Sequence, residues 1–216
     1  FEEGEKYPTV LQIHGGPMAM YNSGFFFEFQ LLAAAGMGVI YTNPRGSQGY
    51  GEDFCAAIAG DWGTVDYQDV MAGVDAALAQ FDWIDADRLG VAGGSYGGYM
   101  TSWVIGHTDR FQAACSMRPV NNCYSFFGTS DGGYMWDEVY GEEEPPWENP
   151  DDYLRQSPLS YVGNVTTPTL IIHSENDYRC RPEQAEQFYI ALKKQGIETE
   201  FLRYPDESHG LSRGGQ

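Results

Sequence analysis

Hydrophobic positions along the chain fall into two alternating kinds of segment. Short apolar runs of β type cover Thr9–His14, Gly38–Thr42, Arg88–Ala92, Ala113–Met117, Thr169–His173 and Thr199–Tyr204. Longer helix-like stretches lie between them, at Phe25–Ala35, Val65–Phe81, Tyr96–Gly106 and Pro182–Gln195. Strands that alternate with helices predict a mostly parallel sheet with helices on both faces. We therefore expect an α/β fold.

The helical segments carry their own start, stop and spacing signals. In Val65–Phe81, the apolar residues Val70, Val74, Ala77 and Leu78 follow helical spacing. Pro182–Gln195 has a proline in its first turn and stops at Gly196, as helices commonly do. The length of 216 residues, with no internal repeat, indicates one domain over residues 1–216.

One segment has a different composition. Gly141–Asp152 is acidic and rich in proline, so it cannot be a core element. We interpret it as a solvated loop. The alternative is part of a lid or an oligomer contact, with Trp136 and Trp147 as anchors, and the sequence leaves both open.

The net charge and the cysteine spacing argue against several classes of partner and cofactor for this protein. A formal net charge of −19 argues against nucleic acid and against anionic membrane surfaces. No apolar run approaches the roughly 18 residues that span a bilayer, and no secretory signal precedes the first strand. The four cysteines form no C-x-x-C pair, so neither a metal site nor a redox motif is expected. A cytoplasmic protein is the resulting expectation.

Candidate chemistry is concentrated at one glycine-rich turn. Gly93-Gly-Ser-Tyr-Gly97 joins the predicted strand Arg88–Ala92 to the predicted helix Tyr96–Gly106 and matches the nucleophile elbow G-x-S-x-G. Such a turn holds its serine, here Ser95, on strained backbone above a sheet. The motif lacks the lysine of a phosphate-binding loop and the third glycine of a dinucleotide fingerprint. Ser95 is therefore the candidate nucleophile.

A serine nucleophile needs a base and a carboxylate that orients the base. Of the four histidines, His209 follows the last predicted strand, where α/β-hydrolases carry the base, whereas His173 lies inside an apolar strand. Asp177 follows the strand Thr169–His173 and is the predicted acid, with Glu175 as its rival. Asp206 and Glu207 share a loop with His209, and we expect them to point to solvent.

The oxyanion donors are predicted from glycines and from a helix start. His14-Gly-Gly-Pro17 follows the first strand, at the position that supplies a second oxyanion amide in lipases and esterases. Gly16 is the predicted donor, with Gly15 as the alternative. The amide of Tyr96, directly after the nucleophile, is the other donor.

These motifs together resemble the catalytic domain of the prolyl oligopeptidase family of serine peptidases, and within it the acylaminoacyl-peptidase branch. The resemblance rests on His14–Pro17, Asn43–Gly51, Gly60–Gly63, Gly93–Met100, Ser157–Pro158, Pro168–His173 and Asn176–Asp177, in family order over nearly the whole chain. It implies an α/β-hydrolase fold, no metal or other cofactor, and a Ser-Asp-His triad. It also implies that Arg179 faces the substrate, although an ordinary surface position is an open alternative.

The resemblance implies hydrolysis of peptide, amide or ester bonds through an acyl-enzyme. The alternatives are a carboxylesterase acting on small or aromatic esters and, from another class, a catalytically silent binding domain. Family members carry a β-propeller, further strands before the one at Thr9–His14 and a final helix after His209, and this chain shows none of them. It therefore resembles a fold truncated at both ends. Because open strand edges and apolar patches favour association, we expect a homo-oligomer or part of a longer chain.

Overall fold

The computed structural model describes residues 1–133 and 144–211. Its centre is a six-stranded sheet with the order β2-β1-β3-β4-β5-β6, and every neighbouring pair is parallel. The strands are β1 (Tyr7–Ile13), β2 (Gly38–Tyr41), β3 (Ile84–Gly94), β4 (Ala113–Met117), β5 (Thr169–Ser174) and β6 (Thr199–Tyr204). All six predicted strands are thus present.

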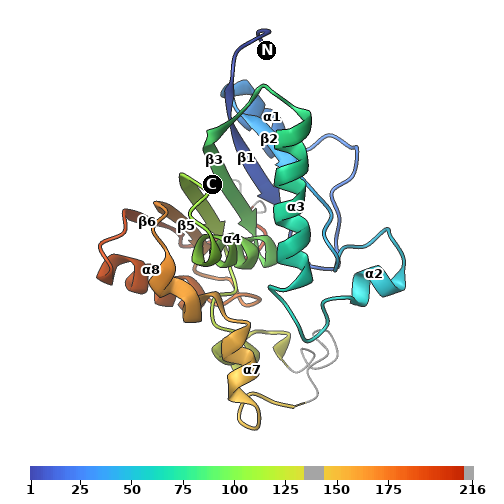
Figure 1. Cartoon of the computed structure of the whole chain (residues 1–216). Helices are drawn as coiled ribbons and strands as arrows, with labels where there is room; N and C mark the ends of the chain where they lie inside the picture. The colour runs from blue at the N-terminus through green and yellow to red at the C-terminus, as the bar shows by residue number, and fades with distance from the viewer. Residues whose placement is uncertain (134–143, 212–216) are drawn as a thin grey trace.

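Helices lie on both faces of this sheet (Figure 1). The long helices α3 (Val65–Gln80), α4 (Tyr96–His107) and α8 (Glu183–Lys194) cover the face turned to the viewer, and α1 (Phe27–Ala34) lies on the other. The remaining helices are short, namely α2 (Glu52–Ala56), α5 (Cys123–Thr129), α7 (Pro150–Arg155) and the 3₁₀ helix η2 (Pro158–Asn164). The parallel sheet with helices on both faces is therefore confirmed.

Several details differ from the sequence-based expectation, besides shifts of one or two residues at the ends of other elements. The strand β3 begins at Ile84, ahead of the predicted Arg88, because Ile84 pairs with Tyr7 across an irregularity in the β1 register. The four short helices were not predicted. Within the acidic segment, Pro150–Asp152 forms the first turn of α7 instead of a loop, since proline suits a helix start.

Of the two proposed anchors in that region, Trp147 is 67% exposed and makes an edge contact with Phe127. Trp136 and residues 141–143 lie outside the described part of the chain.

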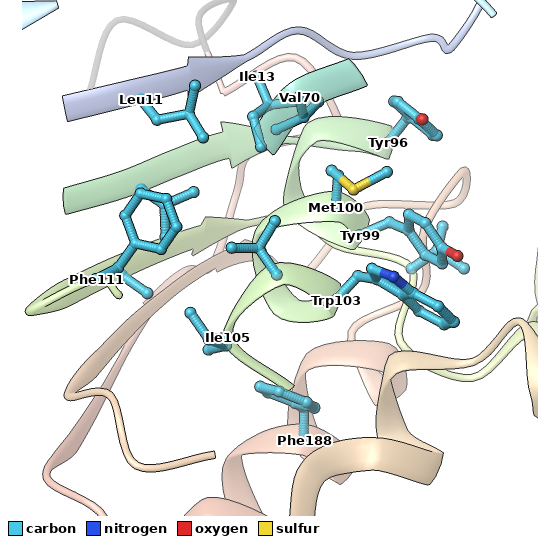
Figure 2. Packing of buried hydrophobic residues seen from close by; sticks show 14 of the residues in the cluster. Leu11, Ile13, Val70, Tyr96, Tyr99, Met100, Trp103, Ile105, Phe111 and Phe188 are labelled. Carbon is cyan, nitrogen blue, oxygen red and sulfur yellow. The ribbon is translucent and has the colours of Figure 1, made fainter. Parts of the chain in front are cut away.

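The helix α4 is the centre of the core (Figure 2). Every residue from Tyr96 to Gly106 is buried, and large side chains such as Tyr99, Met100 and Trp103 pack beside those of the sheet. Glycine allows this close approach, because a Cβ on Gly97 would lie 2.0 Å from the carbonyl oxygen of Ile13. The glycines around Ser95 therefore bring the helix start directly onto the strands.

The opposite face is less covered. Helix α1 has no buried residue, and Phe27 and Leu31 are 66% and 54% exposed. Within residues 1–133 and 144–211, no helix combines the length and the apolar character needed to cross a bilayer.

Candidate active site

Ser95 lies in the sharp turn between β3 and α4. Its backbone has φ 61° and ψ −121°, a left-handed conformation that is strained for any residue except glycine. Its amide donates to the carbonyl of Met117 at 3.0 Å, and its own carbonyl accepts from the amide of Tyr99 at 2.9 Å. The turn is therefore held from β4 and from α4, with the serine partly exposed above the sheet.

His209 and Asp177 meet although they are far apart in the sequence. His209 Nδ1 lies 2.7 Å from Asp177 Oδ2, and the aspartate is fully buried while the histidine side chain is 29% exposed. The other carboxylate oxygen, Oδ1, accepts the amides of Arg179 at 3.0 Å and Cys180 at 2.9 Å. These bonds fix the carboxylate so that its Oδ2 accepts a hydrogen bond from Nδ1–H of His209, which leaves Nε2 as the basic nitrogen.

Ser95 and His209 line the same cavity. Among the described residues, no hydrogen bond joins the two side chains. Hydrogen bonds between nucleophile and base are often long before substrate binds, and they shorten in the reacting complex.

The rival carboxylates are placed elsewhere. Glu175 pairs with Arg203 at 3.1 Å on the exposed side of the loop. Asp206 is exposed, as expected. The expectation for Glu207 was wrong, because it is only 5% exposed and its carbonyl accepts the amide of Asn176. Asp177 is thus the carboxylate that contacts His209.

A second histidine, His173 on strand β5, lies close to Asp177. His173 Nε2 lies 2.7 Å from the carbonyl oxygen of Cys180 and 3.5 Å from Asp177 Oδ2. Burial lowers the pKa of His173, so its ring is neutral at pH 7 and Nε2 carries the proton. Its Nδ1 is buried and has no hydrogen-bond partner among the described residues. His173 therefore contacts the loop that carries Asp177 through the Cys180 carbonyl and the carboxylate itself.

The glycines after β1 lie against the elbow. A Cβ on Gly15 would be 3.1 Å from the carbonyl oxygen of Gly94 and 3.4 Å from Cβ of Ser95. Gly16 has a φ of +127°, which side chains rarely tolerate. His14 holds the loop from below, with Nδ1 2.7 Å from the Gly15 carbonyl oxygen and Nε2 2.9 Å from Ser47 Oγ. The loop after β1 therefore packs its backbone closely against the turn that carries Ser95.

A cavity of about 670 Å³ opens over the elbow. Ser95, Gly16, Tyr96 and His209 line it, together with the aromatic side chains of Tyr21, Phe25, Phe26, Phe29, Trp62 and Phe126. Arg179 also reaches the cavity, where its Nε lies 2.6 Å from Asp131 Oδ1. Among the described residues, no cluster of His, Cys, Asp or Glu is arranged to bind a metal ion.

Tyr96, the residue after Ser95, forms a hydrogen bond with the buried carboxylate of Asp66, which was not predicted from the sequence. The hydroxyl of Tyr96 donates to Asp66 Oδ2 at 2.5 Å, and Asp66 also accepts the amides of Gly63 and Tyr67. Burial raises the pKa of Asp66, and its hydrogen bonds oppose this rise. The available signal was the motif Gly60–Gly63, which precedes Asp66 and was used only for the family resemblance.

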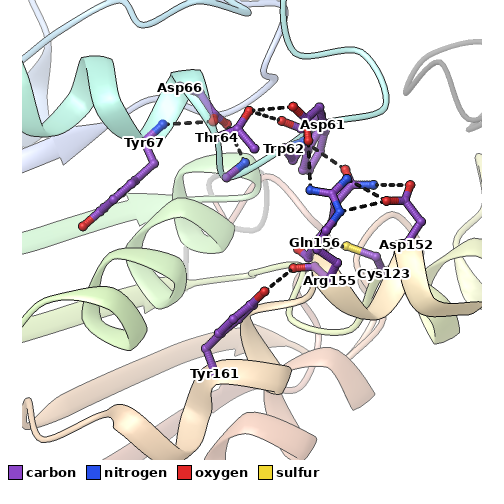
Figure 3. Close-up of polar contacts among 11 residues, drawn as sticks. Asp61, Trp62, Thr64, Asp66, Tyr67, Cys123, Asp152, Arg155, Gln156 and Tyr161 are labelled. Carbon is purple, nitrogen blue, oxygen red and sulfur yellow. Dashed lines mark hydrogen bonds and ion pairs between the residues drawn. The ribbon is translucent and has the colours of Figure 1, made fainter.

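Residues Asp61 and Trp62, which precede Asp66, contact the end of helix α7 (Figure 3). Trp62 packs edge-on against Tyr96, and its amide donates to Gln156 Oε1 at 2.9 Å. Arg155 joins Asp61 and Asp152 through two ion pairs. Residues far apart in sequence thus hold the tryptophan in place beside the elbow.

We expect Tyr96→Phe to destabilise the protein by about 1.5–3 kcal/mol, the usual contribution of a hydrogen bond to a charged group. The variant leaves the buried carboxylate of Asp66 with one donor fewer. Tyr99→Phe is the matched control, because that hydroxyl is also buried on α4 but has no hydrogen-bond partner among the described residues. Urea unfolding measures both, and equal losses would contradict the assignment.

Comparison with known proteins identifies relatives across nearly the whole chain. The chain is 52% identical over 214 residues to a Bacillus subtilis protein named uncharacterized peptidase YuxL, covering 99% of this chain and 32% of that protein. It is 34% identical over 219 residues to the acylamino-acid-releasing enzyme of Arabidopsis thaliana, covering 98% and 28%. The chain therefore spans about a third of the length of these curated relatives.

Solved structures agree with this relationship. The acylaminoacyl peptidase of Pyrococcus horikoshii superposes with a TM-score of 0.94 at 39% identity, over 100% of this chain and 35% of that one. This similarity confirms the α/β-hydrolase fold. The sequence model described as the prolyl oligopeptidase family matches residues 23–216. On the motifs, the fold and this match, the chain belongs to the prolyl oligopeptidase family.

Proposed function

We propose that this chain is a serine hydrolase domain that cleaves its substrate through an acyl-enzyme, with Ser95, His209 and Asp177 as the catalytic residues. The observation that carries the proposal is the contact of 2.7 Å between His209 and the fully buried Asp177 beside a strained serine turn. A structural histidine would not need a fixed carboxylate on one nitrogen and an open cavity on the other.

In this mechanism, His209 Nε2 takes the proton of the Ser95 hydroxyl as the serine oxygen attacks the substrate carbonyl. Asp177 holds the proton on Nδ1 and stabilises the imidazolium that forms. The amides of Gly16 and Tyr96 donate to the oxyanion, where one such donor contributes about 2.7–4 kcal/mol. The imidazolium then protonates the leaving group. In the second half, His209 Nε2 takes a proton from water as the water oxygen attacks the acyl carbonyl. The imidazolium returns that proton to the Ser95 oxygen as the bond to the acyl group breaks.

The proposed substrates are N-acylated peptides. Relatives named acylamino-acid-releasing enzyme and acylaminoacyl peptidase favour this substrate class, and one such structure is described as a complex with Z-Gly-Gly-Phe-chloromethyl ketone. The aromatic lining of the cavity suits an apolar side chain next to the scissile bond. The carboxylesterase alternative is not favoured by these relatives, although the same acyl-enzyme mechanism also applies to esters.

We further propose a cytoplasmic, peptide-handling protein, since all four cysteines are free thiols. The exposed apolar side chains of α1 favour association with a further polypeptide, including a second copy of this chain.

Labelling by a fluorophosphonate probe tests the proposed function directly. The folded protein is expected to react at Ser95 alone, as mapped by peptide mass spectrometry. The rates of hydrolysis of N-acetylated peptide anilides and of p-nitrophenyl acetate are then compared. Efficient cleavage of the anilides indicates a peptidase, and cleavage of the ester alone indicates an esterase. Absence of labelling in protein with a cooperative thermal melt would leave the silent binding domain as the better description.

Arg179 is expected to contribute to substrate binding. Its guanidinium lines the cavity beside the acid loop and is oriented by Asp131. Arg179→Ala should raise KM for N-acetylated peptide anilides about 10-fold, the lower range for a lost hydrogen bond to a charged group. The KM for p-nitrophenyl acetate, which lacks the peptide carbonyl groups, should change less. Equal changes for the two substrates would assign Arg179 to the surface.

A further inference from the structure

Arg118 differs from the other arginines of the described chain in its partners. Six of them form ion pairs with carboxylates, in the pairs Arg45–Asp69, Arg88–Asp85, Arg110–Asp75, Arg155–Asp61, Arg179–Asp131 and Arg203–Glu175. Arg181 lies over the ring of Tyr178 at 4.9 Å. Within residues 1–133 and 144–211, the guanidinium of Arg118 has neither a carboxylate nor an aromatic partner. In a chain of net charge −19, an unpaired arginine needs an explanation.

The backbone holds Arg118 next to the turn that carries Ser95. Its amide donates to the carbonyl of Ile172 at 2.7 Å, and the carbonyl of the preceding Met117 accepts the amide of Ser95. Arg118 has a φ of 41°, in the left-handed region that favours glycine. Such a conformation is unfavourable for a residue with a side chain and persists where surrounding structure enforces it, often at functional sites.

The side chain of Arg118 is directed to the same cavity as Ser95. A Cβ on Gly94 would lie 2.8 Å from Nη2 of Arg118, so the guanidinium packs on the backbone just before the nucleophile. Arg118 lines the cavity together with Ser95 and His209, and it is half-buried. Glycine at position 94 thus leaves the space that the guanidinium occupies.

Other charges in the cavity leave Arg118 available. Arg179 lines it as well but is engaged by Asp131. Glu28 carries the negative charge in the lining, where it accepts a hydrogen bond from Gln12 Nε2 at 3.1 Å and forms no ion pair with Arg118. A partly desolvated guanidinium without a partner is unfavourable, and a carboxylate is the group that matches its planar donors.

We propose that Arg118 binds a carboxylate of the substrate and thereby gives the enzyme a preference for acyl-peptides with a negative charge close to the scissile bond. This inference rests on the proposed function. The carboxylate has two possible sources, the free C-terminus of a short peptide and the side chain of an acidic residue. Both present the same chemistry to the guanidinium.

Matched substrates measure this preference. One pair consists of N-acetylated dipeptides that end in a carboxylate or in a carboxamide, and the other carries glutamate or glutamine beside the scissile bond. The ratio of kcat/KM within a pair is expected to favour the carboxylate. Arg118→Gln should lower that ratio about 10- to 100-fold, the range of a hydrogen bond to a charged group. The pair that responds identifies the source of the carboxylate.

Two further variants make the result specific. Arg118→Lys keeps the positive charge but loses the planar guanidinium with its paired N–H donors. Its kcat/KM ratio within each substrate pair should therefore lie between those of the wild type and Arg118→Gln. Arg181→Gln removes an arginine outside the cavity lining and should leave the ratio at the wild-type value. The proposal would be overturned if Arg118→Gln and the wild type had equal kcat/KM ratios for both substrate pairs. It would also be overturned if Arg181→Gln lowered the ratio as much as Arg118→Gln.

A binding measurement separates this proposal from the proposed function. Calorimetry on Ser95→Ala compares the carboxylate and carboxamide peptides with and without Arg118→Gln, and needs no turnover. Tighter carboxylate binding that disappears with Arg118→Gln supports the site even if the wild-type protein fails to react with a fluorophosphonate. Equal affinities for both peptides would overturn it even if Ser95 is fully reactive. Thermal melting of each variant verifies the fold.

Discussion

Replacing Ser95 with alanine is expected to lower kcat on the order of 10⁶-fold, the loss typical of removing a serine nucleophile. The partly exposed hydroxyl of Ser95 lies on the turn between β3 and α4, outside the hydrophobic core. Alanine keeps the Cβ, so the backbone hydrogen bonds to Met117 and Tyr99 remain. The melting temperature should therefore stay close to that of the wild type, and steady-state kinetics with an acyl-peptide anilide measure the loss.

The matched control for this experiment is Ser102→Ala. Ser102 is a fully buried serine of helix α4 outside the cavity lining. Among the described residues, its hydroxyl forms a hydrogen bond only with that of Ser116, at 3.0 Å. It should lose stability while kcat changes little. If Ser95→Ala retained more than a few per cent of wild-type activity after purification from contaminating hydrolases, Ser95 would not be the nucleophile.

Asp177→Asn is expected to lower kcat by about 10⁴-fold, as in serine proteases whose triad aspartate becomes an amide. An amide can turn its NH₂ group toward His209 Nδ1, which would then have to accept a hydrogen bond instead of donating one. The histidine would present a protonated Nε2 to Ser95 and could not act as the base. Steady-state kcat, measured where wild-type activity is maximal, gives the size of the effect.

Two nearby carboxylates serve as controls for that substitution. Asp206→Asn changes an exposed residue of the His209 loop, and Glu175→Gln changes one that pairs with Arg203. Both should keep kcat within a few-fold of the wild type. A large loss in Asp206→Asn together with a small one in Asp177→Asn would show that another carboxylate orients the base.

The long elements could be read from the sequence because each has a local cause. Strands such as Ala113–Met117 and Thr199–Tyr204 match the structure in both bounds. Helix α3 follows helical spacing of its apolar residues, and α8 ends before a glycine. The short helices α2, α5 and α7 contain too few residues for a periodic pattern. They form where tertiary packing holds them, since isolated helices of this length are unstable in water.

The candidate nucleophile, base and acid could also be proposed from sequence, since each follows a strand in the order that the fold requires. The choice between Asp177 and Glu175 rested on position alone. The structure distinguishes them by hydrogen bonds, because the amides of Arg179 and Cys180 turn the carboxylate of Asp177 toward His209. A two-residue difference in a loop leaves no periodic trace that a sequence could reveal.

The sequence by itself determined the alternation of strands and helices, the glycine-rich turn at Ser95 and the family, because each depends on neighbours along the chain. Only the tertiary structure decided which distant groups meet. Trp62 and Gln156 lie 94 positions apart and share a hydrogen bond, and Tyr96 finds Asp66 across 30 positions. Arg118 reaches the backbone of Gly94 through the pairing of β3 with β4. Such contacts follow from the order of strands in the sheet and the packing of α4 on it, which no local pattern encodes.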